Sequence, residues 1–154
     1  MEIESRIFGH NQNIPAKYTC DGANVSPALV FADVPAGAKS LVLIMDDPDA
    51  PRGILRPGSG QAWVHWTMWN IPPETKEIAE NSVPAGALEG VTSFGKPGYG
   101  GPCPPSGTHR YFFKLYALDS MFDLPPETDK AQLEQAMAGH ILAQGELIGL
   151  YARQ

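Results

Sequence analysis

Apolar residues in this chain occur in short runs between turn-forming residues, rather than with the sustained 3.6-residue period of long helices. Fifteen prolines and sixteen glycines among the 154 residues separate these runs. This punctuation is typical of many strands joined by turns. The pattern predicts strands over residues 3–8, 16–20, 28–33, 41–46, 62–71, 109–118 and 146–152.

Two of the predicted strands are apolar on both faces. Residues 41–45 read Leu-Val-Leu-Ile-Met, and residues 111–118 are apolar or aromatic apart from Lys114. A strand without a polar face is covered from two sides. We therefore expect these two strands at the centre of a sheet.

One helix is predicted, from Asp129 to Ala138. Thr128 is the expected N-cap and Gly139 the expected stop. The expected core stripe of this helix is Ala131, Leu133, Ala136 and Met137.

Composition and charge narrow the class of protein. A hydrophobic fraction of 43% with 18% charged residues is ordinary for one globular domain of this length. The net charge of −6 opposes binding to nucleic acid or to an anionic membrane surface. The N-terminus has no signal-like basic and apolar segments, and no stretch has the length of a membrane span. These features predict a cytoplasmic protein, although a mature secreted form would read the same.

The two cysteines, Cys20 and Cys103, fit no zinc or thioredoxin spacing. Free thiols are the expectation for a cytosolic protein, and one disulfide is the alternative.

Three ionisable side chains lie at or near strand ends and on apolar faces. Asp47 shares a face with Leu41, Leu43 and Met45 by the two-residue period, while His65 and His109 share faces with aromatic residues. Burying such groups is costly unless they are paired or hydrogen-bonded. We therefore expect Asp47, His65 and His109 to converge around one cavity.

The loops next to these residues support a binding pocket. The Asp47-Pro48-Asp49-Ala50-Pro51 turn is stiff because proline fixes its own φ and restricts the preceding residue. Gly100 and Gly101 precede His109, and glycine backbone allows N–H groups to approach a ligand oxygen closely. Arg110 is expected to point away from His109 and to brace a carboxylate such as Asp49.

The same motifs carry a family resemblance. Residues 47–51 (DPDAP), 63–66 (WVHW), 70–72 (NIP), 101–102 (GP) and 107–111 (GTHRY) resemble signature blocks of the phosphatidylethanolamine-binding protein family. Residues 18–22 (YTCDG), with Asn24 and Ser26-Pro27, resemble its bacterial and archaeal branch, which is called Raf kinase inhibitor-like. The blocks occur in the family's order over essentially the whole chain.

The resemblance implies a mainly β Greek-key fold with a large central sheet, a smaller packed sheet and one or two short helices. It also implies a small pocket that accepts phosphate-like or carboxylate anions, without a cofactor or metal. The implied ligand-binding residues are Asp47, Pro51, Trp63, His65, Gly101, Pro102, His109 and Tyr111. Cys103 replaces a second proline of the animal members, and the chain ends at Gln154 without their C-terminal helix. These two departures weigh against phospholipid head-group binding and kinase inhibition, so the small-anion pocket is the property that we carry over.

A bound phosphate can keep one proton, because its second pKa lies near 6. Asp47 is expected to accept this proton while the two histidines donate to the anion. Imidazolium has one more donor and a positive charge, so anion affinity is expected to rise as the pH falls from about 8 to about 6.

Two other function classes use the same residues. A hydrolase is the alternative, with Asp47, His65 and His109 in acid–base or metal-assisted chemistry and Ser106 as the nearby serine. In an inhibitor-like protein, the pocket would bind an anionic group on a partner protein. The apolar segment 147–151 suggests a homodimer, and burial of this segment within one subunit is the alternative.

Overall fold

The strands pair into two sheets of unequal size in a computed structural model that describes all residues 1–154. The large sheet has the order β2 (Gln12–Asn13), β9 (Ile141–Tyr151), β8 (His109–Leu118), β4 (Ser40–Asp47), β5 (Trp63–Ile71) and β7 (Leu88–Glu89). The small sheet has the order β1 (Glu2–Glu4), β3 (Leu29–Ala32) and β6 (Glu77–Ile78). Helix α1 (Lys130–Met137) and the 3-10 turns η1 (Ala16–Tyr18) and η2 (Arg52–Ile54) complete the elements. The predicted mainly β class is confirmed.

The large sheet contains a Greek-key connection. β4, β5 and β7 are antiparallel neighbours, and the chain then returns so that β8 pairs with the free side of β4. The spatial order β8-β4-β5-β7 is that of a Greek key. β4 is consequently an inner strand, and all eight of its residues are buried. The apolar run from Leu41 to Met45 predicted this position.

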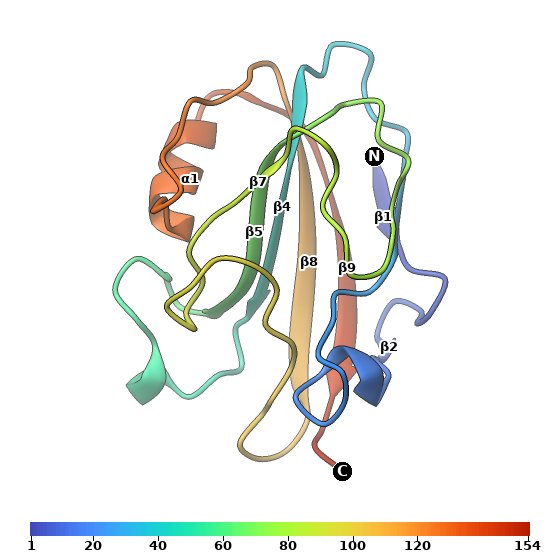
Figure 1. Ribbon diagram of the computed structural model, residues 1–154, viewed down its shortest axis with the longest axis vertical. Coiled ribbons are helices and arrows are strands. Elements are labelled where there is room, and N and C mark those ends of the chain that lie inside the picture. Colours follow the sequence, from blue (N-terminus) through green and yellow to red (C-terminus); the bar gives the residue numbers. More distant parts are fainter.

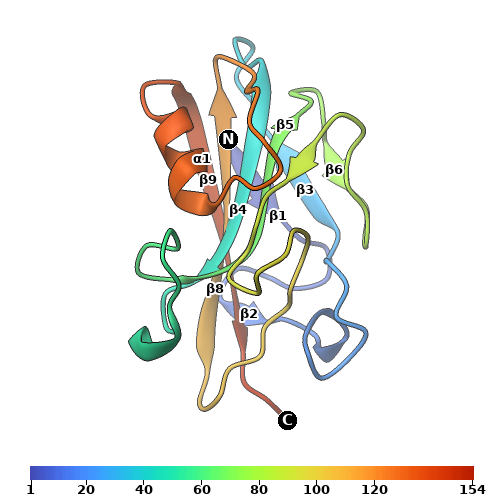
Figure 2. The same ribbon diagram turned by 60° about the vertical axis from the view of Figure 1, so that its left-hand side comes forward.

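The two faces of the large sheet are covered by different elements. On one face, Leu41, Leu43 and Met45 pack in the main core with Leu29 and Phe31 of the small sheet. On the other face, helix α1 covers a second and smaller cluster of buried apolar residues. Figures 1 and 2 show the helix and the small sheet on opposite sides of the long strands. The members of the cluster under the helix are Val42, Ile44, Trp69, Leu118, Leu133 and Met137.

An ion pair fixes α1 to the sheet. Lys130 Nζ lies 2.8 Å from Asp46 Oδ2, and both side chains are buried. Lys114 Nζ lies 3.2 Å from the same oxygen, but its side chain is 31% exposed. Lys130 is therefore the partner that keeps the Asp46 carboxylate paired within the interior.

Several predicted boundaries were wrong. Residues 16–20 form the 3-10 turn η1 rather than a strand, because the Pro15 carbonyl accepts a hydrogen bond from the Tyr18 amide at 3.1 Å. The predicted strand at 3–8 is reduced to β1, since Ser5 bonds out of the sheet to Ala28 O at 2.9 Å. β9 begins at Ile141, five residues before its predicted start at Glu146.

The predicted helix is present with a different cap. Asp129 is the N-cap and accepts a hydrogen bond from the Gln132 amide, and the Gln132 side chain bonds back to complete a capping box. Thr128 Oγ1 instead donates to Pro125 O at 2.6 Å. Ala131 and Ala136 are half-buried, so the core stripe reduces to Leu133 and Met137. The helix ends before Gly139, as predicted. Gly139 has a φ of +83°, a backbone conformation that favours glycine.

The edge of β9 that faces away from β8 is paired, near its C-terminal end, with another strand of the same chain. Gln12 and Asn13 of β2 pair with Gly149 and Leu150 of β9. Leu147 and Tyr151 are buried as well. A homodimer remains a prediction, and it would have to use a surface other than this edge.

No helix in the structure has the length and apolar character needed to cross a membrane.

Replacing Lys130 with methionine is expected to lower the free energy of unfolding by about 3 kcal/mol, because the buried Asp46 carboxylate loses its buried counter-ion. The double variant Asp46→Leu with Lys130→Met is expected to recover most of this loss, since no buried charge remains. Urea denaturation of the two variants and the native protein measures both effects. Equal stability of the native protein and Lys130→Met would contradict the assignment.

Candidate functional site

A small pocket opens at the end of β4, on the side of the large sheet that faces the small sheet. Its volume is about 120 Å³, roughly that of four water molecules in the liquid. Drug-sized ligands occupy pockets of about 300 Å³ or more, so this one suits a smaller group. The lining residues are Asp47, Ala50, Pro51, Ile54, Trp63, His65, Phe94, Cys103, Pro104, Pro105, His109 and Tyr111.

Strand pairing explains why distant residues meet in this pocket. Asp47 on β4 is paired with Trp63 on β5, and the neighbouring Asp46 is paired with Phe112 on β8. The β4–β5 register shifts between the Met45–Trp66 and Asp46–Val64 pairs, which leaves His65 unpaired at a β-bulge, and its side chain lines the same pocket as Trp63. The predicted convergence of Asp47, His65 and His109 is therefore present in the structure.

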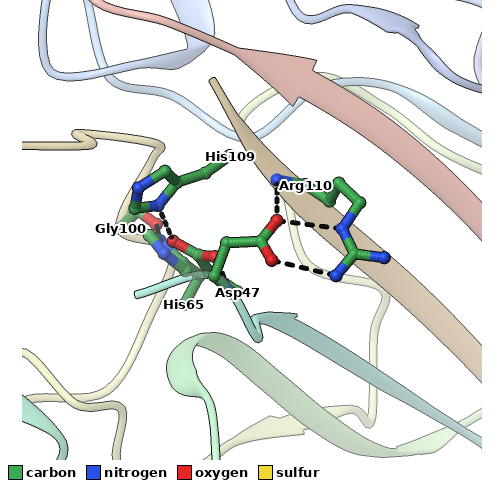
Figure 3. A network of polar contacts seen from close by, with 6 residues as sticks. Asp47, His65, Gly100, His109 and Arg110 are labelled. Carbon is green, nitrogen blue, oxygen red and sulfur yellow. Dashed lines mark hydrogen bonds and ion pairs between the residues drawn. The ribbon is translucent and has the colours of Figure 1, made fainter. Parts of the chain in front are cut away.

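Asp47 and His109 form a buried pair within the pocket (Figure 3). His109 Nδ1 lies 2.7 Å from Asp47 Oδ2, and the Asp49 amide donates to Asp47 Oδ1 at 2.8 Å. Burial raises the pKa of the Asp47 carboxyl, while the hydrogen bond from His109 counters part of the increase. Both carboxylate oxygens already accept a hydrogen bond from the protein. The main role of Asp47 in this arrangement is to orient His109.

His65 has a different partner and a different protonation state. Its Nδ1 lies 2.6 Å from the carbonyl oxygen of Gly100 (Figure 3). A carbonyl only accepts, so Nδ1 carries the proton and Nε2 carries a lone pair. Burial lowers the pKa of His65 to about 4. The expectation that both histidines become donors near neutral pH is thus wrong for His65.

Arg110 braces the turn that holds Asp47. Its Nε and Nη2 donate to the two oxygens of Asp49 at 2.9 Å each, and its backbone amide adds a third bond of the same length. The guanidinium holds the pKa of the Asp49 carboxyl below its usual range. Figure 3 shows the Arg110 side chain directed away from His109, as predicted.

Gly101 and Pro102 do not line the pocket, although both were predicted to. The Gly101 amide donates to Asn24 Oδ1 at 2.8 Å, and the Pro102 carbonyl accepts from the Cys20 amide at 3.1 Å. A Cβ on Gly101 would lie 2.3 Å from Tyr18 O, so this position requires glycine for packing. The Gly100 amide bonds to His65 O at 3.0 Å. Neither glycine amide is left for the predicted anion contact.

The cysteines form a disulfide, which corrects the expectation of free thiols. Cys20 and Cys103 are 83 residues apart in sequence, yet their Cα atoms lie 5.4 Å apart. The hydrogen bonds of Gly101 and Pro102 to residues 20 and 24 bring the two segments together. Because Cys103 also lines the pocket, the disulfide fixes part of the pocket wall.

Sequence reasoning missed several residues of the apolar wall. Phe94 contacts both Trp63 and His65 edge to face, with ring centroids 5.4 Å apart in each pair. Its only signal in the sequence is that it is a lone aromatic residue in a stretch of polar and glycine residues, 92–98. Ile54, which is 49% exposed, lines the pocket from the 3-10 turn η2.

The other hollows lack this combination of groups. A larger one of about 430 Å³ lies between β1 and β9, and the carboxylates of Glu2, Glu4 and Glu146 line it. No group of three or more His, Cys, Asp or Glu side chains in the chain is arranged to hold a metal ion. Ser106 is exposed and is not part of the pocket lining. The hydrolase alternative therefore finds no support in the structure.

The comparison with protein families identifies the chain. Residues 4–152 match the family model described as phosphatidylethanolamine-binding protein. The chain belongs to this family, and the resemblance seen in the sequence motifs is confirmed.

Relatives of similar length support the assignment. The chain is 47% identical to a UPF0098 protein of Methanothermobacter thermautotrophicus, with 99% of each chain covered. A UPF0098 protein of Aquifex aeolicus is 48% identical, with 99% of this chain and 89% of the relative covered.

Two solved structures are close to this one in fold. A phosphatidylethanolamine-binding protein homologue from Chlamydia trachomatis is 41% identical and superposes with a TM-score of 0.93, covering 99% of this chain and 97% of its own. YbcL of E. coli is 28% identical with a TM-score of 0.88, covering 99% and 98%.

Replacing both cysteines with serine is expected to lower the free energy of unfolding by about 2–4 kcal/mol, because the unfolded chain gains the freedom of a long open loop. Guanidinium denaturation measures the loss. Reduction of the native protein by a dithiol should reproduce it, whereas the double serine variant should not respond to the dithiol. A native protein whose stability is unchanged on reduction would contradict the prediction.

Stability is expected to fall as the pH drops from about 7 to about 4, by about 3 kcal/mol through His65 alone. Unfolded His65 takes up a proton below its ordinary pKa of 6.5, whereas folded His65 stays neutral down to about 4, so acid favours the unfolded chain. Urea denaturation at several pH values measures this loss. His65→Asn lacks the titrating ring and should lose less stability over the same range. Parallel pH profiles for the two proteins would refute the assignment.

Proposed function

We propose that this protein binds a small oxyanion, such as a phosphomonoester, in the pocket beside His109. The observation that carries the proposal is the orientation of His109. Its Nδ1 is held by Asp47 at 2.7 Å, and its Nε2, the ring's other polar atom, bonds to no group of the chain. In the imidazolium form, Nε2–H is a charged donor available to a ligand, and Asp47 balances its charge.

The rest of the pocket supports an anion of limited size. Only four of the lining side chains are polar, namely Asp47, His65, His109 and Tyr111. The side chains between them are apolar, and a charged hydrogen bond is stronger beside apolar groups than in bulk water. The net charge of −6 gives no general attraction for anions, so any selective binding would have to arise from the pocket itself.

The family name supplies further support, since it refers to a molecule that contains phosphate. The name describes the group as a whole, and the ligand of this chain is the subject of the proposal. In this proposal the pocket acts in binding, and a regulatory role would follow if the oxyanion is presented by another protein.

Replacing His109 with alanine is expected to weaken the binding of methyl phosphate at least about tenfold, because the charged donor is lost and Asp47 is left facing the anion. Isothermal titration calorimetry measures the affinity.

His140→Ala is the matched control for this experiment. His140 Nδ1 also pairs with a carboxylate, Asp119 Oδ1 at 2.8 Å, but the pair lies on the surface and outside the pocket. This variant should bind methyl phosphate like the native protein. If the native protein does not bind methyl phosphate, or if both histidine variants bind it equally well, the proposed function is wrong.

A further inference from the structure

His65 presents a hydrogen-bond acceptor to the pocket, although histidines beside anions usually serve as donors. The bond from Nδ1 to Gly100 O places the ring proton on the side away from Nε2. Nε2 bonds to no group of the chain, and it is not among the polar atoms sealed in the interior. Because His65 lines the pocket, a ligand would meet this lone pair.

The ring of His65 is held in this orientation from several sides. It packs edge to face against Phe94 and Tyr111, with centroid distances of 5.4 and 5.2 Å. Its backbone carbonyl also accepts from the Gly100 amide at 3.0 Å, so the two residues are tied by two bonds. Turning the ring over would leave the Gly100 carbonyl without its side-chain partner, which disfavours that orientation.

His65 Nε2 differs from the neighbouring Asp47 oxygens in having no hydrogen-bond partner within the chain. Asp47 Oδ1 and Oδ2 already accept from Asp49 N and His109 Nδ1. His109 Nε2 has no partner in the chain and is the complementary donor. The pocket therefore presents a donor on His109 and an acceptor on His65 to the same small ligand, beside the hydroxyl of Tyr111.

We propose that the pocket selects oxyanions that carry one proton, and that the Nε2 lone pair of His65 accepts the hydrogen bond from the ligand's O–H group. This inference rests on the proposed function and specifies its ligand class. A phosphomonoester monoanion has both an ionised oxygen for His109 and an O–H for His65. Sulfate esters, phosphodiesters and carboxylates have no O–H. One of their oxygens would therefore face the lone pair of His65 Nε2, and the two acceptors would repel each other.

This selectivity bears on the source of the ligand. The head group of an intact phospholipid is a phosphodiester and lacks the required proton, whereas free phosphate and monoesters have it near neutral pH. The proposal therefore favours a soluble monoester or a phosphorylated side chain over a lipid head group. It also removes carboxylates from the ligands expected from the sequence.

Three methyl esters of like charge and similar size test the proposal: methyl phosphate, methyl sulfate and dimethyl phosphate. Calorimetric titration at about pH 6, near the second pKa of a phosphomonoester, provides the protonated monoanion of the first. The native protein should bind methyl phosphate at least about tenfold more tightly than the other two, since an unmet buried acceptor costs about 1–3 kcal/mol. Methyl sulfate is close in shape to methyl phosphate and differs chiefly in the missing proton.

His65→Asn identifies the residue responsible. The asparagine amide can occupy the position of Nδ1 and still donate to Gly100 O, but it has no atom in the place of Nε2. The variant should bind methyl phosphate no more tightly than methyl sulfate. Circular dichroism and thermal unfolding establish whether the variant is folded. The comparison of the three ligands in the native protein tests the selectivity even if the variant does not fold.

The outcomes separate this inference from the proposed function. Equal binding of all three esters by the native protein would overturn the selectivity and leave oxyanion binding intact. No binding of any ester would refute the proposed function, and the selectivity with it. Preserved selectivity in a folded His65→Asn protein would overturn the assignment of the acceptor to His65.

Discussion

The pairing of β4 with β5 on one side and β8 on the other is the constraint on which the site depends. It places the end of β4 between two strands that come from distant parts of the chain. Asp47 lies at this end and can be buried only because His109 and the Asp49 amide satisfy its oxygens. The Greek-key return of β8 thus provides the partner that the Asp47 carboxylate needs, and the pocket forms around that pair.

The two histidines show how hydrogen-bond partners give identical side chains different properties. In both rings Nδ1 bonds to the protein, but the acceptor is a carbonyl for His65 and a carboxylate for His109. A carbonyl cannot compensate the charge of a buried imidazolium, so His65 stays neutral, whereas Asp47 can balance a charge on His109. A composition of one carboxylate and two histidines therefore does not by itself define the chemistry of a pocket.

Strong local patterns were predictable from the sequence, whereas features set by contacts between distant segments were not. The bounds of β8 and the burial of β4 followed from runs of mainly apolar and aromatic residues, and Asp47, His65 and His109 were found because they lie on apolar faces. The start of β9 was missed because Ile141 and Leu142 are exposed and the strand contains Gly145. The disulfide and the packing role of Gly101 depend on the approach of the segment around Asn24, which no local pattern reveals.

Asp46 and Asp47 are adjacent in β4 and point to opposite faces of the sheet. Asp46 meets Lys130 beneath the helix, while Asp47 meets His109 in the pocket. A slip of β4 by one residue would turn every side chain to the other face. Because both faces of this strand are otherwise apolar, hydrophobicity alone would penalise that slip little, but a slip in either direction would leave Lys130 or His109 without its carboxylate. The two aspartates therefore favour the observed alignment of β4 over arrangements shifted by one residue, which its apolar side chains alone would distinguish poorly.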